Sequence, residues 1–221
     1  MRLNGFLSRC VELGIKLNKA KMEVPADSIT FMGHCVNSHG FSVDPEKLSA
    51  MTKVKEPQNI DELRQFLGIF NYVMKSVPNL ARVTYLLHNL LKKDVESNWS
   101  SAQQEAFGKV KLLITNTPVL AFYDSGKELT LENDACKYGL GSCMLQDCQP
   151  LAYATRALTN TETRYAQIEK EMLAAIYGLE KFRHYTYGRT VNVITDHKPL
   201  VAICSKALSK APRLLQSYYK R

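Results

Sequence analysis

The sequence predicts a mixed α/β fold in which a sheet with covering helices follows a smaller, mostly helical region that contains a β-hairpin. Three observations support this fold class. Residues 28–43 have the pattern of a short hairpin, and residues 44–117 carry apolar side chains at helical spacing between caps and prolines. From Pro118 onward the order becomes strands, a long helix, another strand and a short helix. We therefore expect the main boundary near residues 95–100.

The composition indicates a folded protein with a basic surface. A chain of 221 residues with 45% hydrophobic residues can build one large or two small cores. The 29 Lys and Arg exceed the 21 Asp and Glu, which gives a net charge of +8. This surplus favours polyanionic partners, nucleic acid above all, although a merely soluble basic protein has the same balance.

The cysteines and the N-terminus give information about the compartment. The six cysteines have no zinc-site spacing, which is typical of reduced thiols in an intracellular protein. The first residues do not resemble a signal peptide, and no apolar run approaches the length needed to span a membrane. We expect an intracellular protein without a membrane partner, in a cytoplasmic particle or in the nucleus.

The N-terminal elements are a one-sided helix over residues 3–17 and a hairpin. In the hairpin, residues 29–36 form the first strand, residues 37–40 the turn and residues 41–43 the return strand. A chain that starts inside such a helix indicates a segment cut from something longer.

Four helix starts follow, each marked by a capping residue or by a proline at the first helical position. They are at Asp44-Pro45, at Asn59 with Glu62, at Asn79, and at Ser100 with Gln103. The second of these helices places apolar residues on one side, namely Leu63, Phe66, Leu67, Phe70 and Met74.

The second half of the chain contains the strand-like segments VLAFY, ELTLEND, GLGSCML and PLAYATRAL, a long helix over about residues 162–185, and the strand TVNVITD. In the long helix Glu171 falls inside the apolar stripe, three residues after Ile168 and four before Ala175. Lys170 falls on the opposite, solvent side. Glu171 is therefore predicted to point at the core.

Two further carboxylates end strands. Asp134 ends ELTLEND and Asp196 ends TVNVITD. If these strands are neighbours and the helix crosses them, three acids meet at one place. Their mutual repulsion would raise their pKa values unless a cation lay between them.

Magnesium suits such a cluster, because it prefers oxygen ligands and keeps bound water. Two ions about 4 Å apart can activate a water and stabilise a leaving oxygen in phosphodiester cleavage. The sequence therefore predicts Asp134, Glu171 and Asp196 as catalytic residues and ligands of two Mg²⁺ ions, for which Mn²⁺ can substitute. Alternatively, each aspartate is a turn former or helix cap, and Asp196-His197-Lys198-Pro199 has that composition.

With these residues identified, the chain resembles the Pol polyprotein of gypsy-like LTR retrotransposons over nearly its whole length. The matching segments are FMGHCVNSHGFSVDPEKL, ELRQFLGIFNYV, LENDACKYGLG, PLAYATRAL, ETRYAQIEKEMLAAIYGLEKFRHYTYGR and VITDHKPL. They occur in the order of that family.

The resemblance implies three parts. Residues 1–24 resemble the end of a reverse-transcriptase palm, residues 25–95 a primer-grip hairpin with thumb-like helices, and residues 96–221 a ribonuclease H-like domain that lacks its C-terminal end. The family's metal-binding acids map to Asp134, Glu171 and Asp196. Contacts to the template-primer duplex map to Phe31, Met32, Gly33 and His34 of the primer grip. Arg64 and Gln65 either contact the duplex backbone, as the thumb of that family does, or lie on the solvated face of an ordinary helix.

The sequence departs from the family in two ways. No two aspartates are adjacent, so the Tyr-x-Asp-Asp motif of the polymerase site is absent and the chain is expected not to polymerise DNA by itself. The family's fourth acidic ligand, near the end of the ribonuclease domain, is also not found before QSYYKR. Both ends therefore look truncated.

Three functions follow from these features. The first is metal-dependent cleavage of RNA in RNA–DNA hybrids, with the rest of the Pol polyprotein as a possible partner. The second is a catalytically impaired fragment that binds nucleic acid without cutting it. The third is a relic that does not fold stably, because uncovered apolar stripes remain at both ends.

Overall fold

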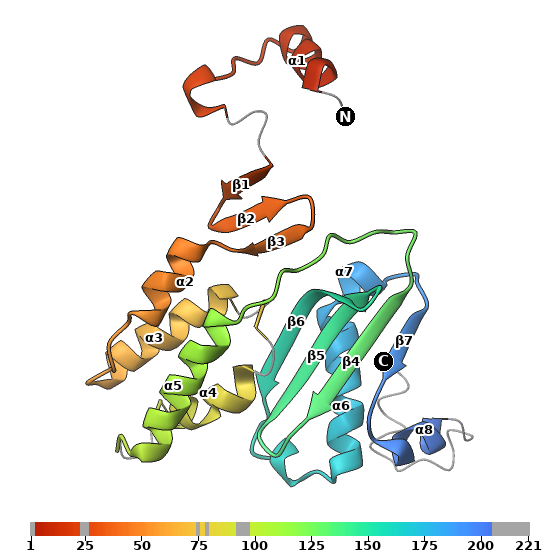
Figure 1. Cartoon of the computed structure of the whole chain (residues 1–221). Helices are drawn as coiled ribbons and strands as arrows, with labels where there is room; N and C mark the ends of the chain where they lie inside the picture. The colour runs from red at the N-terminus through yellow and green to blue at the C-terminus, as the bar shows by residue number, and fades with distance from the viewer. Residues whose placement is uncertain (1–2, 23–26, 74–75, 78–79, 92–97, 205–221) are drawn as a thin grey trace.

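The structure, a computed structural model, describes residues 3–22, 27–73, 76–77, 80–91 and 98–204. In this part of the chain a small sheet and a helical bundle precede a four-stranded sheet that is covered by a long helix (Figure 1). The mixed α/β fold expected from the sequence is confirmed. The predicted residue bounds of the three parts stay a prediction.

The N-terminal segment holds the helix α1 (Leu3–Glu12), a single turn of 3₁₀-helix (Lys19–Lys21) and a three-stranded antiparallel sheet. The strands are β1 (Ser28–Phe31), β2 (His34–Asn37) and β3 (Gly40–Val43). The prediction of one strand over residues 29–36 was wrong. Met32 and Gly33 have φ angles of 49° and 77° and form a two-residue turn that reverses the chain.

The helical bundle consists of α2 (Pro45–Thr52), α3 (Ile60–Val73), α4 (Leu80–Asn89) and α5 (Ser101–Thr115). The predicted caps are present: Asp44 accepts from the Glu46 N–H, Asn59 accepts from the Glu62 N–H, and Ser100 forms a capping box with Gln103. Phe66, Phe70 and Phe107 meet at the centre of the bundle, with ring centroids 4.5–4.7 Å apart. The predicted apolar side of α3 is buried as far as its side chains are described. Met74 lies outside the described residues.

The larger sheet has the order β6-β5-β4-β7. Its strands are β4 (Leu129–Ala135), β5 (Gly139–Gln146), β6 (Gln149–Ala157) and β7 (Val191–Ile194). The first three form an antiparallel meander, and β7 pairs parallel to β4. The connection between β6 and β7 passes through η3 (Glu162–Arg164), α6 (Gln167–Lys181) and α7 (Arg183–Thr186), and α8 (Lys198–Cys204) follows β7.

Helix α6 covers one face of this sheet (Figure 1). The approach is close at Gly178, where a Cβ atom would lie 2.8 Å from the Ser142 hydroxyl and 2.9 Å from a methyl group of Leu131. The Ser142 hydroxyl also donates to the Ala174 carbonyl at 3.1 Å. Small side chains therefore hold α6 directly on β4 and β5.

The long helix differs from its prediction at both ends and at one residue. It begins at Gln167 rather than near residue 162, because a 3₁₀ turn and an extended Tyr165 precede it, and it ends at Lys181 before the separate turn α7. Glu171 is buried, as predicted. Lys170 is also buried, with 7% of its surface exposed, which corrects its assignment to the solvent side.

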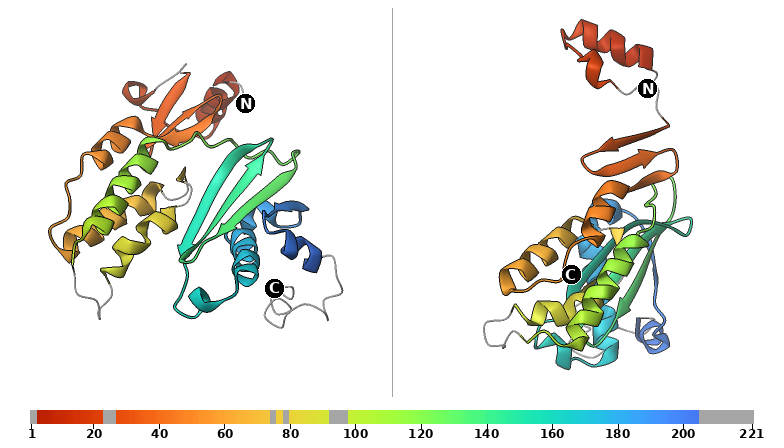
Figure 2. Two further views of the ribbon diagram at one scale, coloured as in Figure 1. Left: turned by 60° about the horizontal axis from the view of Figure 1, so that its bottom comes forward. Right: turned by 60° about the vertical axis from the view of Figure 1, so that its left-hand side comes forward.

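The N-terminal part of the chain contacts the part that forms the larger sheet near both ends of that sheet. Phe41 of β3 and Leu120 form an isolated antiparallel bridge, and the VLAFY segment forms this bridge rather than the predicted strand. At the other end of the sheet, α4 packs against β5 and β6 (Figure 2). There Tyr85 stacks on Tyr138 of the β4–β5 turn, with ring centroids 4.1 Å apart.

Within the described part of the chain, no helix has both the length and the apolar character required to cross a bilayer.

Candidate active site

The parallel pairing of β4 and β7 brings two of the predicted acids to one sheet edge. The last paired residues are Glu132 and Ile194. Asp134 and Asp196 each lie two residues beyond this last pair, Asp134 after Glu132 and Asp196 after Ile194. Because the strands are parallel, both carboxyl ends lie at the same edge of the sheet. Asp196 lies in a bend after β7 rather than inside the strand, and its carbonyl accepts from the Lys198 N–H at 3.1 Å.

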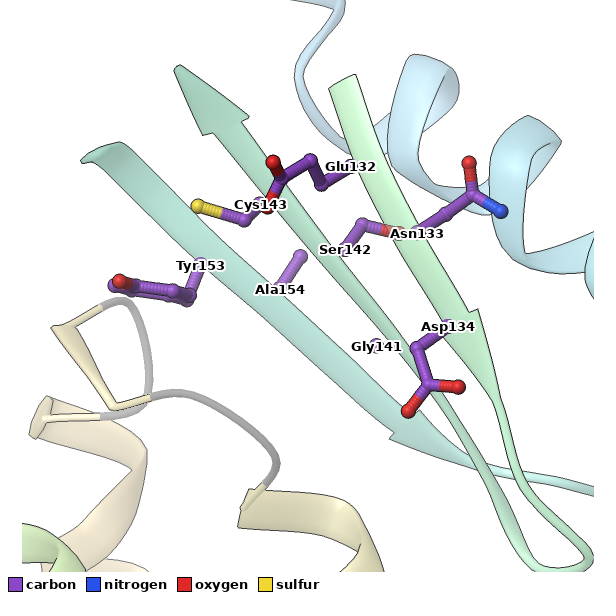
Figure 3. Close-up of a pocket in the computed structure, with 8 residues that line it drawn as sticks. All are labelled: Glu132, Asn133, Asp134, Gly141, Ser142, Cys143, Tyr153 and Ala154. Carbon is purple, nitrogen blue, oxygen red and sulfur yellow. The ribbon is translucent and has the colours of Figure 1, made fainter. Parts of the chain in front are cut away.

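The alternation along β4 decides which side each residue faces. Leu129, Leu131, Asn133 and Ala135 are buried, whereas Glu132 and Asp134 are exposed. Figure 3 shows Asn133 extending toward α6 and Asp134 away from it. Asp134 therefore lies at the end of the face that α6 leaves uncovered.

That face is hollowed. A cavity of about 240 Å³ extends from Asp134 across β4, β5 and β6. Its lining consists of Glu132, Asn133, Asp134, Gly141, Ser142, Cys143, Tyr153 and Ala154 (Figure 3). The third acid, Glu171, reaches the same sheet edge from the covered side.

Glu171 is held in place by hydrogen bonds to the end of β4 and to its own helix. The side-chain amide of Gln167 donates to Glu171 Oε1 at 2.6 Å and to the Ala135 carbonyl at 2.7 Å. The other oxygen, Oε2, is buried and has no hydrogen-bond partner in the described residues. An unsatisfied buried carboxylate oxygen is costly and requires an explanation.

The electrostatic surroundings of Glu171 link the three acids. Burial, together with the charges of Asp134 and Asp196, raises the pKa of this carboxyl to about 7, against the lowering effect of the Gln167 hydrogen bond and of the nearby Ala135 N–H. Both aspartates are therefore within electrostatic range of Glu171. None of the groups that act on this pKa is a cation.

These features fit a divalent cation. Three carboxylates from three elements supply hard oxygen donors, and the free Oε2 of Glu171 is one of them. In the described ranges, however, no three His, Cys, Asp or Glu side chains already lie at metal-binding distances. Asp134, Glu171 and Asp196 therefore lie near the same end of the sheet, but their carboxylates are not within metal-binding distance of a common point.

Cys143 and Tyr153 of the cavity were not singled out by the sequence. Burial raises the pKa of the Cys143 thiol and of the Tyr153 hydroxyl to about 12 each. The thiol therefore stays protonated near neutral pH and is a poor nucleophile or metal ligand. Gln167 was also missed, although a glutamine four residues before Glu171 is a detectable helical pair.

The residues predicted to contact nucleic acid lie on two elements. In the β1–β2 turn, Phe31 and Met32 are 62% and 78% exposed, whereas Gly33 is buried and His34 is half-buried against Phe41. Arg64 and Gln65 are exposed on α3, where Arg64 pairs with Asp61 at 2.5 Å. The two groups are on different elements.

The larger sheet and the helix that crosses it lie in the part of the chain that is similar to a known family of domains. Residues 99–193 match the family described as RNase H-like domain found in reverse transcriptase. The predicted resemblance to retrotransposon Pol polyproteins is confirmed.

Among proteins with similar sequences, the Tf2-3 and Tf2-4 transposon polyproteins of Schizosaccharomyces pombe are each 32% identical over 202 residues. The alignment covers 88% of this chain and 15% of each relative, so the chain spans about a seventh of their length.

Among solved structures, the foamy viral protease-reverse transcriptase in complex with an RNA/DNA hybrid aligns with a TM-score of 0.76. It is 20% identical, and the alignment covers 99% of this chain and 32% of that one. The same protein in complex with double-stranded DNA aligns with a TM-score of 0.73 and 20% identity, over 88% of this chain and 42% of that one. At this identity the likeness establishes the fold.

Proposed function

We propose that this chain cleaves the RNA strand of RNA–DNA hybrids in a reaction that depends on divalent metal ions. The observation that carries the proposal is the meeting of Asp134, Glu171 and Asp196 at one sheet edge, where the two aspartates raise the pKa of the buried glutamate. The RNase H-like family match and the hybrid bound by the foamy viral relative support the choice of substrate.

The three carboxylates would hold the ions, Mg²⁺ or Mn²⁺. When bound, two such ions supply an activated water and stabilise the leaving oxygen. Asp134 and Asp196 are exposed and reach the substrate side, whereas Glu171 supplies one buried oxygen from below. The rigid attachment of Glu171 to β4 fixes the distance between the two sides of the site before substrate arrives.

The test is cleavage of a labelled RNA–DNA hybrid with Mg²⁺ or Mn²⁺ by the wild type and by Asp134→Asn. The matched control is Asp147→Asn, at an exposed turn residue with φ 51° that asparagine tolerates. We expect Asp134→Asn to lose cleavage activity. We expect the control Asp147→Asn to cleave the hybrid as the wild type does. Equal cleavage by wild type and Asp134→Asn would reject the proposal.

A second candidate is a domain that binds hybrid without cutting it. It is favoured by the lack of three potential metal ligands already in contact within the residues that the structure covers. It predicts binding that weakens steeply with salt. It also predicts no turnover with Mn²⁺ for either the wild type or the aspartate variants.

We propose no DNA polymerisation by these 221 residues, because none of their aspartates are adjacent. We also propose that the β1–β2 turn, together with Arg64 and Gln65, contacts a nucleic-acid duplex. We further propose that the chain associates with other parts of a Pol polyprotein and is located inside the cell. Substitution of Met32 by Ser would test the turn, and weaker duplex binding at unchanged stability is the expected result.

A further inference from the structure

Gln167 connects the end of β4 to the carboxylate of Glu171. It is the first residue of α6 and lies one helical turn before Glu171 on the same side of the helix. A side-chain amide nitrogen carries two protons. Here they are donated to two acceptors, the Ala135 carbonyl at 2.7 Å and Glu171 Oε1 at 2.6 Å.

This arrangement distinguishes the two oxygens of Glu171. Oε1 is engaged by Gln167, whereas Oε2 is buried and has no hydrogen-bond partner in the portion of the chain described. A carboxylate held at one oxygen by a bridging amide cannot rotate to present both oxygens without breaking that bond. Glu171 is therefore set to offer a single oxygen, Oε2.

The bridge also ties the helix to the strand that carries Asp134. Ala135, whose carbonyl accepts from Gln167, directly follows Asp134 and is the last residue of β4. A shift of α6 along the sheet would break this bond, so the amide fixes Glu171 relative to Asp134 as well as to its own helix.

We infer that Gln167 is a positioning residue that orients Glu171 so that Oε2 faces the divalent cation. This inference rests on the proposed function, because the cation is the one proposed there. Gln167 itself touches neither the ion nor the substrate. Partners that orient a metal ligand typically change metal affinity or activity by about 10–100-fold when they are removed.

An alternative role for Gln167 is direct contact with the nucleic acid, since part of its surface is exposed. In that role its loss would raise KM and leave metal affinity unchanged. The two internal hydrogen bonds favour the positioning role, because both amide protons are already used within the protein.

The test uses Gln167→Met, in which an unbranched side chain of similar length and helix propensity replaces the amide. Mn²⁺ binding to the full chain, without nucleic acid, is measured by the electron paramagnetic resonance signal of the free ion. We expect affinity to fall about 10-fold. For hybrid cleavage we expect kcat to fall with KM unchanged. The control is Gln149→Met, at the exposed first residue of β6, for which neither quantity should change.

A thermal melt of each variant monitors folding, and Gln167→Asn is the second variant if Gln167→Met does not fold. Asparagine is shorter by one methylene and can reach only one of the two acceptors, so an intermediate loss of Mn²⁺ affinity is expected. Equal Mn²⁺ affinity in the wild type and in the folded Gln167 variant would overturn the inference. The inference would also be overturned if the wild type did not bind Mn²⁺, or if the variant changed only the KM for the hybrid. Wild-type protein that binds Mn²⁺ but leaves the hybrid intact would reject the proposed function and leave the positioning role standing.

Discussion

Replacing Glu171 by glutamine tests the electrostatics of the acidic edge without any substrate. Burial, with Asp134 and Asp196 nearby, raises the pKa of this carboxyl from its usual 4.5 to about 7 in the folded chain. A raised pKa means that folding disfavours the ionised form. The destabilisation of the folded state by ionised Glu171 is absent below about pH 4.5. It grows as the pH rises and is complete above about pH 7.

The size of the effect follows from the displacement of the pKa. At about 1.36 kcal/mol for each pKa unit, the change from 4.5 to about 7 corresponds to at most about 3 kcal/mol. Glu171→Gln cannot ionise, so it should be more stable than wild type at pH 8 by up to about that amount. At pH 4 the two proteins should have nearly the same free energy of unfolding.

The assay is urea unfolding at pH 4, 6 and 8, with a chelator present so that no divalent cation neutralises the carboxylate. Glu46→Gln, at an exposed position of α2, is the matched control and should show no such pH dependence. A difference between Glu171→Gln and wild type that is the same at pH 4 and pH 8 would refute the reasoning. It would mean that Glu171 is not in the buried, negatively charged setting described here.

Three further predictions concern the packing around the site. Arg156 donates to both oxygens of Glu162 at 2.8 Å and holds its pKa at about 2, so Arg156→Met should cost about 2 kcal/mol. In urea melts this deficit should be complete above about pH 5 and shrink as the pH falls toward 2; a constant deficit would contradict it. Gly178→Ala should destabilise the folded protein by about 1–3 kcal/mol, because the added methyl group meets side chains of the sheet. Gly108→Ala on α5, where the space is open, should stabilise the folded protein by about 1 kcal/mol. Thermal melts that rank the two glycine variants the other way would disprove the close approach of α6. Tyr85→Leu removes a ring stack and should cost about 1 kcal/mol; no loss in the melt would show that the stack does not join the bundle to the sheet.

Several features of this chain could be predicted from the sequence because they depend on neighbours within a few residues. Period-2 alternation predicted β4, and capping residues predicted the starts of α2, α3 and α5. The position of Glu171 inside an apolar helical stripe predicted its burial. Such patterns can be interpreted without the tertiary structure, because the spacing of side chains along a helix or strand is the same in every fold.

Other features arose only from contacts between distant segments. The parallel pairing of β4 with β7 joins residues 62 positions apart, and only this pairing brings Asp134 and Asp196 to the same end of the sheet. The burial of Lys170 was likewise not predicted, because the helical pattern alone placed this residue on the solvent side. The turn at Met32 and Gly33 was also missed, because the segment was interpreted as one continuous strand.

By itself, then, the sequence determined which residue types occur at strand ends and on helix faces, and so which acids were available for a metal site. The tertiary structure alone decided that these acids share one edge, that Gln167 bridges Ala135 and Glu171, and that one carboxylate oxygen remains free. The physical reason is that strand pairing and helix docking depend on the summed packing of the whole sheet. That sum includes groups such as Gly178 and Ser142, whose contact no local pattern reveals.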